Sequence, residues 1–222
     1  MMPLQIQPPA SEAQLLERTH AIEGLSFAQL ASRLNVCIPE HALQRKGWAG
    51  QAIEKALGAS AGSRAEPDFH HLGIELKTLP MNHLGRPAES TFVTTIPLLT
   101  IHQQTWLTST CYAKLKRVLW VPIEGDIRIP FPHRRIGGGV LWSPSVDEQA
   151  VLAQDWSELS LMIGAGQLSE IHANMGDYLQ VRPKAANAKS LCYGYDDLGN
   201  KVLTLPRGFY LRSRFTDTLF MG

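Results

Sequence analysis

The sequence predicts a mixed α/β fold in which one central sheet is flanked by helices. Several segments repeat their apolar residues every three to four positions, as one face of a helix requires, and residues 26–34 and 145–163 also begin with a capping box. Other segments are short, rich in Val, Ile and Thr, and alternate apolar with polar residues, as in residues 72–79. Because the two patterns are interspersed along the chain, they favour a domain that mixes helices and strands.

The same patterns place the individual elements. The first helix is expected to bury Leu15, Leu16 and Ile22, which lie on helical spacing. Helices are expected at residues 11–23, 26–34, 47–58 and 169–175, within 102–116, and from 145 through 163. Strands are expected at residues 72–79, 91–99, 117–123, 135–142, 178–181, 202–205 and 208–212.

Length and composition restrict the class of protein. The 222 residues suit a single domain, residues 1–222, whose N-terminal and C-terminal lobes form a cleft. Lys and Arg number 21 and Asp and Glu 20, so a nucleic-acid-binding face has to be local. The three cysteines form no CxxC pair and indicate neither a disulfide framework nor a zinc site. Without a signal peptide or an apolar run of about 18 residues, the chain is expected in the cytoplasm, away from membranes.

The segment EPDFHHLGIELKTL carries the strongest chemical signal. On a strand, Glu75 and Lys77 face the same side, while Asp68 lies just upstream, where a bend brings it beside Glu75. Two neighbouring carboxylates repel each other unless a cation lies between them, and such oxygen ligands suit Mg²⁺. A metal, a positioned water and a fixed positive charge from Lys77 are what phosphodiester cleavage needs.

A simpler interpretation stays open on these residues alone. Glu75 and Lys77 can form an exposed ion pair on an ordinary half-solvated strand, because Glu-x-Lys after a loosely spaced Asp is a weak pattern.

A family resemblance adds to this interpretation. The stretch KGWAGQAIEKALGASAGSRAEPDFHHLGIELKTLP, with RPKAAN and PRGFYL further on, resembles the MutH family of methyl-directed mismatch-repair endonucleases. The resemblance spans nearly the whole chain and implies a fold like that of the restriction endonucleases. It implies that Asp68, Glu75 and Lys77 are catalytic and that Glu54 is a further active-site carboxylate, with Asp68, Glu75 and Glu54 at the metal. It also implies DNA contacts for Lys46, Arg182, Pro183, Lys184 and Tyr210.

The resemblance further implies an activity and its partners. The expected protein is a Mg²⁺-dependent endodeoxyribonuclease of mismatch repair that nicks the unmethylated strand of double-stranded DNA at hemimethylated GATC sites. MutL is the implied activator, itself recruited by MutS, and we expect a monomer. A type II restriction endonuclease that cuts both strands of a short palindrome is the alternative enzyme, and a catalytically inactive DNA-binding module is the alternative of another class.

The residues by themselves leave the DNA contacts open. Arg182 and Lys184 flank Pro183 in a loop, which suits contact with phosphate or base edges but is also typical of a solvated basic turn. Tyr210, between Phe209 and Leu211, fits either a core strand or a base-contacting position. His70 and His71 are expected at the surface, because they lack the partners of a metal site.

Overall fold

The computed structural model describes residues 6–45, 47–60, 62, 66–184 and 189–220 of the chain. It contains two compact units, each formed by two stretches of sequence. The first unit comprises Met1–Ala88 and Lys116–Ser143, and the second comprises Glu89–Leu115 and Pro144–Gly222.

Helices in the first unit begin and end where the capping residues predict. Ser26 caps its helix with the full capping box, in which Gln29 bonds back to the backbone of Ser26. Gly47 and Gly58 bound the next long helix with φ values of 87° and 82°, which favour glycine. The helices are α1 (Glu12–Ile22), α2 (Phe27–Leu34), α3 (Ala42–Arg45) and α4 (Trp48–Leu57), with 3₁₀ turns η1 (His70–Leu72) and η4 (Phe131–His133).

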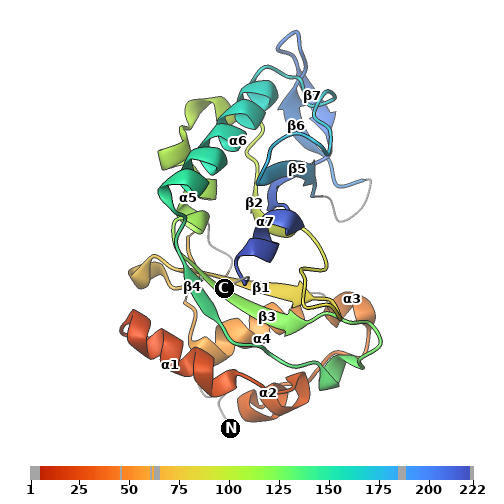
Figure 1. Cartoon of the computed structure of the whole chain (residues 1–222). Coiled ribbons are helices and arrows are strands. Elements are labelled where there is room, and N and C mark those ends of the chain that lie inside the picture. Colours follow the sequence, from red (N-terminus) through yellow and green to blue (C-terminus); the bar gives the residue numbers. More distant parts are fainter. Residues whose placement is uncertain (1–5, 46, 61, 63–65, 185–188, 221–222) are drawn as a thin grey trace. The chain divides into compact units, whose positions relative to one another are not determined.

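A three-stranded mixed sheet forms the other half of the first unit. Its order is β1 (Glu75–Met81), β3 (Val118–Glu124) and β4 (Val140–Trp142), with β1 parallel to β3 and β4 antiparallel to β3. Helix α4 packs against β1, as Figure 1 shows beside the yellow and green strands. The buried core between helices and sheet includes Leu15, Phe27, Ile53, Ile74 and Val121.

The second unit contains a long helix and a separate antiparallel sheet. The sheet has the order β2 (Thr91–Thr95), β8 (Arg207–Leu211) and β5 (Leu179–Pro183). Strands β6 (Cys192–Tyr195) and β7 (Lys201–Thr204) form a separate two-stranded hairpin. The helical elements are η2 (Ile101–Gln103), η3 (Trp106–Thr108), α5 (Thr110–Leu115), α6 (Val146–Gly164) and α7 (Ser213–Thr218). Helix α6 packs against β5 (Figure 1).

A buried carboxylate ties α6 to the sheet of the second unit. Asp155 is 4% exposed and accepts hydrogen bonds from the backbone N–H groups of Asp177, Tyr178 and Leu179 at 2.8, 2.6 and 2.8 Å. These N–H groups precede or open β5, so Asp155 fixes the start of this strand against the helix.

The predicted mixed α/β class is confirmed, and several details differ. The described strands divide into three sheets, not one, because the two units each form their own. The strand expected at residues 135–142 is shorter, β4 (Val140–Trp142), because Arg135 and Ile136 form only isolated bridges, to Ser26 and Ile123. Residues 169–175 form turns and not the predicted helix. Leu16, expected inside, is 38% exposed.

No helix in the described part of the chain is both long and apolar enough to span a membrane.

Candidate active site and nucleic-acid interface

A tight hairpin brings Asp68 beside β1. Phe69 and Ile74 pair antiparallel around the turn η1, and Gly73 closes it with a φ of 67°. The Oδ2 atom of Asp68 then accepts a hydrogen bond from the backbone N–H of Leu76 at 2.8 Å. The predicted bend is therefore present, and it holds this carboxylate next to the strand position of Glu75.

Glu75 and Lys77 form a buried ion pair. The Nζ atom of Lys77 lies 3.0 Å from Oε1 of Glu75, and the residues are 8% and 3% exposed. The interpretation of this pair as an exposed one on a half-solvated strand is therefore wrong. The parallel strand β3 lies beside this part of β1, where Glu75 pairs with Val118 and Lys77 with Trp120, both of which are fully buried.

Glu54 projects from the half-buried side of α4, the helix that packs on β1. Its Oε1 atom and the Oγ1 atom of Thr78 both border the empty side-chain position of Gly50, at 4.0 and 3.7 Å from where a Cβ atom would lie. The carboxylate of Glu54 and the hydroxyl of Thr78 therefore lie on the same side of Gly50, where α4 packs on β1.

The donor set fits a divalent cation of the hard class. Asp68 and Glu75 offer carboxylate oxygens, and Mg²⁺ typically takes one or two carboxylates with water and substrate phosphate completing its shell. Among the described residues, no group of three His, Cys, Asp or Glu side chains is close enough to hold a metal ion. The ligand set Glu54, Asp68 and Glu75 therefore stays a prediction.

In the second unit, cations and aromatic rings gather on one face of the antiparallel sheet. Phe92 and Tyr210 meet edge to face at 5.3 Å between ring centroids. The Nζ atom of Lys184 lies 4.1 Å from the centroid of Phe92, and Cζ of Arg182 lies 5.8 Å from that of Tyr210. Such cation–π contacts hold flexible basic side chains in place. We call these four residues, Phe92, Arg182, Lys184 and Tyr210, the basic-aromatic face.

Tyr210 belongs to the outer face of its sheet. Its neighbours Phe209 and Leu211 are 1% and 0% exposed and point into the core, whereas Tyr210 is partly exposed on the opposite side. The interpretation of Tyr210 as a core residue is therefore wrong. Burial raises the pKa of the Tyr210 hydroxyl above 10.0, against a smaller opposite effect of Arg182, so the hydroxyl is protonated at neutral pH and can donate a hydrogen bond.

Arg182 and Pro183, which were expected in a basic loop, are instead the last residues of strand β5, where they pair with Gly208 and Arg207. Arg182, Pro183 and Lys184 are all exposed, and the backbone N–H of Lys184 donates to the carbonyl of Pro206 at 2.7 Å. Lys46, predicted as a DNA contact, lies outside the described residues. The two histidines predicted at the surface, His70 and His71, are exposed.

Sequence reasoning missed Phe92 and Gly208 as parts of this face. Phe92 was visible only as one apolar residue of an expected strand, and Gly208 only as part of the PRGFYL motif. The contact of Phe92 with Tyr210 and Gly208 depends on the pairing of β2 with β8, which no local pattern contains.

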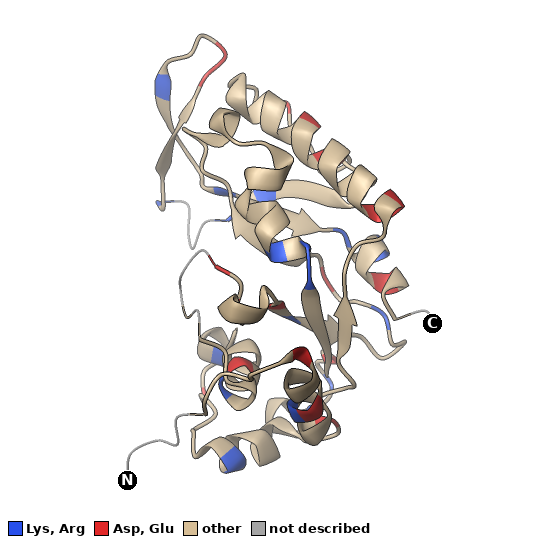
Figure 2. Ribbon diagram, turned by 90° about the vertical axis from the view of Figure 1, so that its left-hand side faces the viewer, with Lys and Arg blue, Asp and Glu red and all other residues tan. Residues whose placement is uncertain are grey.

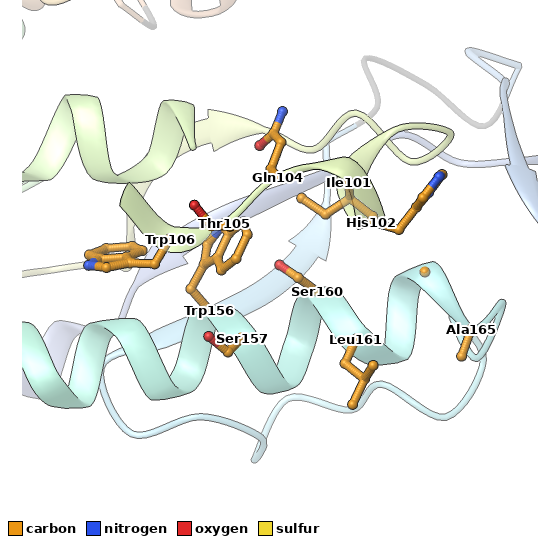
Figure 3. Close-up of a pocket in the computed structure, with 11 residues that line it drawn as sticks. Ile101, His102, Gln104, Thr105, Trp106, Trp156, Ser157, Ser160, Leu161 and Ala165 are labelled. Atoms are coloured by element: carbon orange, nitrogen blue, oxygen red, sulfur yellow. The ribbon is translucent and has the colours of Figure 1, made fainter. Parts of the chain in front are cut away.

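A pocket elsewhere in the second unit has different chemistry. It encloses about 590 Å³ between α6 and the segment from Ile101 to Trp106, and Ser160 points from the helix toward that segment (Figure 3). None of its lining residues is Lys or Arg. Helix α6 carries Asp147, Glu148, Asp155 and Glu158 without any basic residue, as the red segments in Figure 2 show. The acidic helix α6 and the pocket beside it are therefore poorly suited to bind the negatively charged DNA backbone. The basic-aromatic face is the better candidate for a nucleic-acid interface.

Comparisons with known proteins find relatives along nearly the whole chain. A family model described as "DNA mismatch repair enzyme MutH" matches residues 57–155. The chain is 49% identical over 213 residues to the DNA mismatch repair protein MutH of Vibrio parahaemolyticus, covering 96% of this chain and 94% of the relative. It is 50% identical over 211 residues to that of Histophilus somni, with 95% and 94% covered. The corresponding Escherichia coli K12 protein is 49% identical over 214 residues, with 96% and 93% covered.

Proposed function

Because this chain belongs to the MutH family of DNA mismatch-repair enzymes and is an endodeoxyribonuclease, we propose that it nicks the unmethylated strand of hemimethylated GATC sites in a Mg²⁺-dependent reaction. The observation that carries the proposal is the arrangement at β1. There, Asp68 accepts a hydrogen bond from the backbone N–H of Leu76. The residues before and after Leu76 are the buried ion pair Glu75 and Lys77.

In the proposed reaction, Asp68 and Glu75 hold the cation and Glu54 adds a carboxylate nearby. The chemistry that a bound divalent cation supplies is Lewis-acid stabilisation of the charge developing on the phosphate. Lys77 orients the attacking water and adds fixed positive charge. The contact with Glu75 at 3.0 Å supports this role, since it prevents the long lysine side chain from sampling other positions.

DNA is proposed to bind through the basic-aromatic face together with Lys46 and Pro183. Arg182 and Lys184 suit phosphates or base edges in the major groove, and their contacts with the rings of Tyr210 and Phe92 help to hold both cations in place. Tyr210 is proposed as the methylation sensor. The adenine N6-methyl group replaces a donor hydrogen with an apolar group, to which a neutral Tyr ring and hydroxyl respond.

Regulation is proposed to come from MutL, recruited by MutS, acting on a monomeric enzyme in the cytoplasm. An unregulated nickase would cut newly replicated DNA everywhere, so low intrinsic activity is expected. An activator that prefers the DNA-gripping conformation raises activity by shifting the population toward it. Adding MutL and ATP at low enzyme concentration should therefore increase the nicking rate, and an unchanged rate would contradict this part.

The decisive experiment maps the cut on a hemimethylated GATC duplex labelled on both strands, with Mg²⁺. The proposal expects one nick, in the unmethylated strand, and no cut in a duplex whose GATC is replaced by another tetranucleotide. Cleavage of both strands of an unmethylated site in one binding event would favour the restriction-enzyme alternative. Binding without any cleavage in Mg²⁺ or Mn²⁺ would favour an inactive DNA-binding module.

A further inference from the structure

The rings of Phe92 and Tyr210 meet above a glycine. Gly208 lies two residues before Tyr210 on β8 and so belongs to the same face of the sheet. A Cβ atom at Gly208 would lie 2.9 Å from Cε2 of Phe92, 3.2 Å from the carbonyl oxygen of Thr94 and 3.3 Å from Cε2 of Tyr210. The two rings therefore occupy the space that any other residue would fill.

The backbone of Gly208 does not itself require glycine. Among the described residues, left-handed conformations occur at Asn35 and at other glycines and not at Gly208, so an alanine at 208 meets no backbone strain. The conflict lies with the neighbours. The carbonyl of Thr94 is held within β2, which pairs with β8 through Thr94–Phe209 and Thr95–Gly208. A side chain at 208 is thus accommodated by movement of the rings.

Movement of the rings would carry the cations with it. Lys184 stacks on Phe92 and Arg182 on Tyr210, so the positions of both basic groups depend on where the rings lie. On the far side of Tyr210, the register partner on β5 is Gln180, whose Nε2 atom donates to Ser90 Oγ at 2.8 Å and which is 6% exposed. Tyr210 therefore lies between Phe92 on β2 and Gln180 on β5, and Gly208 is its nearest neighbour on the same face of β8.

We propose that Gly208 is a specificity-determining position: by carrying no side chain, it lets the rings of Phe92 and Tyr210 close over it and so sets where Tyr210 and the two stacked cations meet the DNA. The inference rests on the proposed function of this face. Gly208 acts through the rings and is a positioning residue, without contact to the reacting groups.

The test is Gly208→Ala, assayed by single-turnover nicking of unmethylated, hemimethylated and fully methylated GATC duplexes. The expected result is a change of about tenfold in the ratio between these rates, the size of losing one good base contact. The melting temperature should stay within about 4 °C of the wild-type value. The matched control is Gly194→Ala on β6, where a Cβ atom would meet Thr204 Cγ2 at 3.2 Å and Leu168 Cδ1 at 3.4 Å, away from the basic-aromatic face. This control should leave the ratio unchanged.

An unchanged ratio in Gly208→Ala, or an equal fall on all three duplexes, would overturn the inference. If Gly208→Ala melts far below wild type, Phe92→Leu replaces it as the test. This change removes the ring above Gly208 while keeping an apolar side chain, and it should alter the ratio as well; an unchanged ratio there also overturns the inference. Tyr210→Ser distinguishes failure of the proposed sensor from failure of the role of Gly208. An unchanged ratio in Tyr210→Ser contradicts the sensor role of Tyr210. A changed ratio in Tyr210→Ser with an unchanged ratio in Gly208→Ala contradicts only the role of Gly208.

Discussion

Lys77 and Glu75 are joined by a 3.0 Å contact between Nζ and Oε1, and only 8% and 4% of their side chains are exposed. Removing a charge from water costs several kcal/mol, and the opposite charge offsets this cost only when the geometry is close. Each side chain thus holds the other in place. Variants of either residue report on stability as well as on chemistry, and the predictions below separate the two effects.

Asp68→Asn should abolish nicking and leave DNA binding intact. The amide keeps an oxygen that can accept from the backbone N–H of Leu76, so the local hairpin survives, but the charge that would hold the cation is lost. A single-turnover rate at least about 10²-fold lower is expected, with an unchanged Kd for DNA. Glu17→Gln, an exposed change on α1, is the control. Substantial Mg²⁺-dependent nicking by Asp68→Asn would remove Asp68 from the catalytic set.

Lys77→Met should destabilise the fold and slow the chemistry. The buried Glu75 carboxylate then lacks the lysine, so the free energy of unfolding should fall by about 3–5 kcal/mol in urea denaturation. Adding Glu75→Gln should restore part of that stability without restoring activity. The nicking rate of Lys77→Met should drop at least about 10²-fold under conditions where the variant is folded. If only DNA affinity fell, Lys77 would be a phosphate contact.

Lys184→Ala should cost affinity for the GATC site more than for random DNA. A base-edge contact discriminates by about 1–3 kcal/mol, whereas a phosphate contact weakens all sequences alike and lowers the salt slope by about one. Lys201→Ala, an exposed lysine on β7, serves as the control. Titrations of both duplexes at several salt concentrations measure the difference, and equal losses would identify Lys184 as a backbone contact.

Asp155→Ala should destabilise the second unit. The change leaves three backbone N–H groups at the start of β5 without their acceptor, at an expected cost of about 2–4 kcal/mol. Glu158→Ala, an exposed change on the same helix, should alter the free energy of unfolding by less than about 0.5 kcal/mol. Equal effects of the two changes would show that the Asp155 contacts do not stabilise β5.

Glu12→Gln should reduce the loss of stability in acid. Hydrogen bonds from Arg117 at 2.6 Å lower the pKa of the Glu12 carboxyl below 4.5 in the folded protein. A carboxyl with a depressed folded pKa stabilises above its unfolded pKa, and this contribution is lost as the pH falls through the folded pKa. The difference in stability between wild type and Glu12→Gln should therefore shrink as the pH falls below about 4.5 and vanish only below the lowered folded pKa. A constant difference from pH 7 to pH 3 would contradict this ion pair's role.

Much of the local structure is determined by the sequence itself. Capping boxes at Ser26 and Ser145 and glycines at Gly47 and Gly58 mark helix ends, because these residues satisfy end groups through neighbours a few positions away. The period of two along β1 placed Glu75 and Lys77 on the same side, which follows from the pleat alone. The family motifs include the segment that forms β1, so the sequence alone identifies the catalytic candidates.

Tertiary structure alone decided what surrounds those residues. The Glu75–Lys77 pair lies beside the buried residues Val118 and Trp120 because β3 pairs alongside β1, and strand pairing across such a separation in sequence leaves no trace in a local pattern. The division of the strands into separate sheets has the same origin, since each unit is assembled from two distant stretches of chain. Phe92 reaches Tyr210 only through the pairing of β2 with β8, and the two rings can lie over Gly208 only because this residue has no side chain. Periodicity shows which way a side chain faces, whereas its neighbours are set by packing between segments far apart in the sequence.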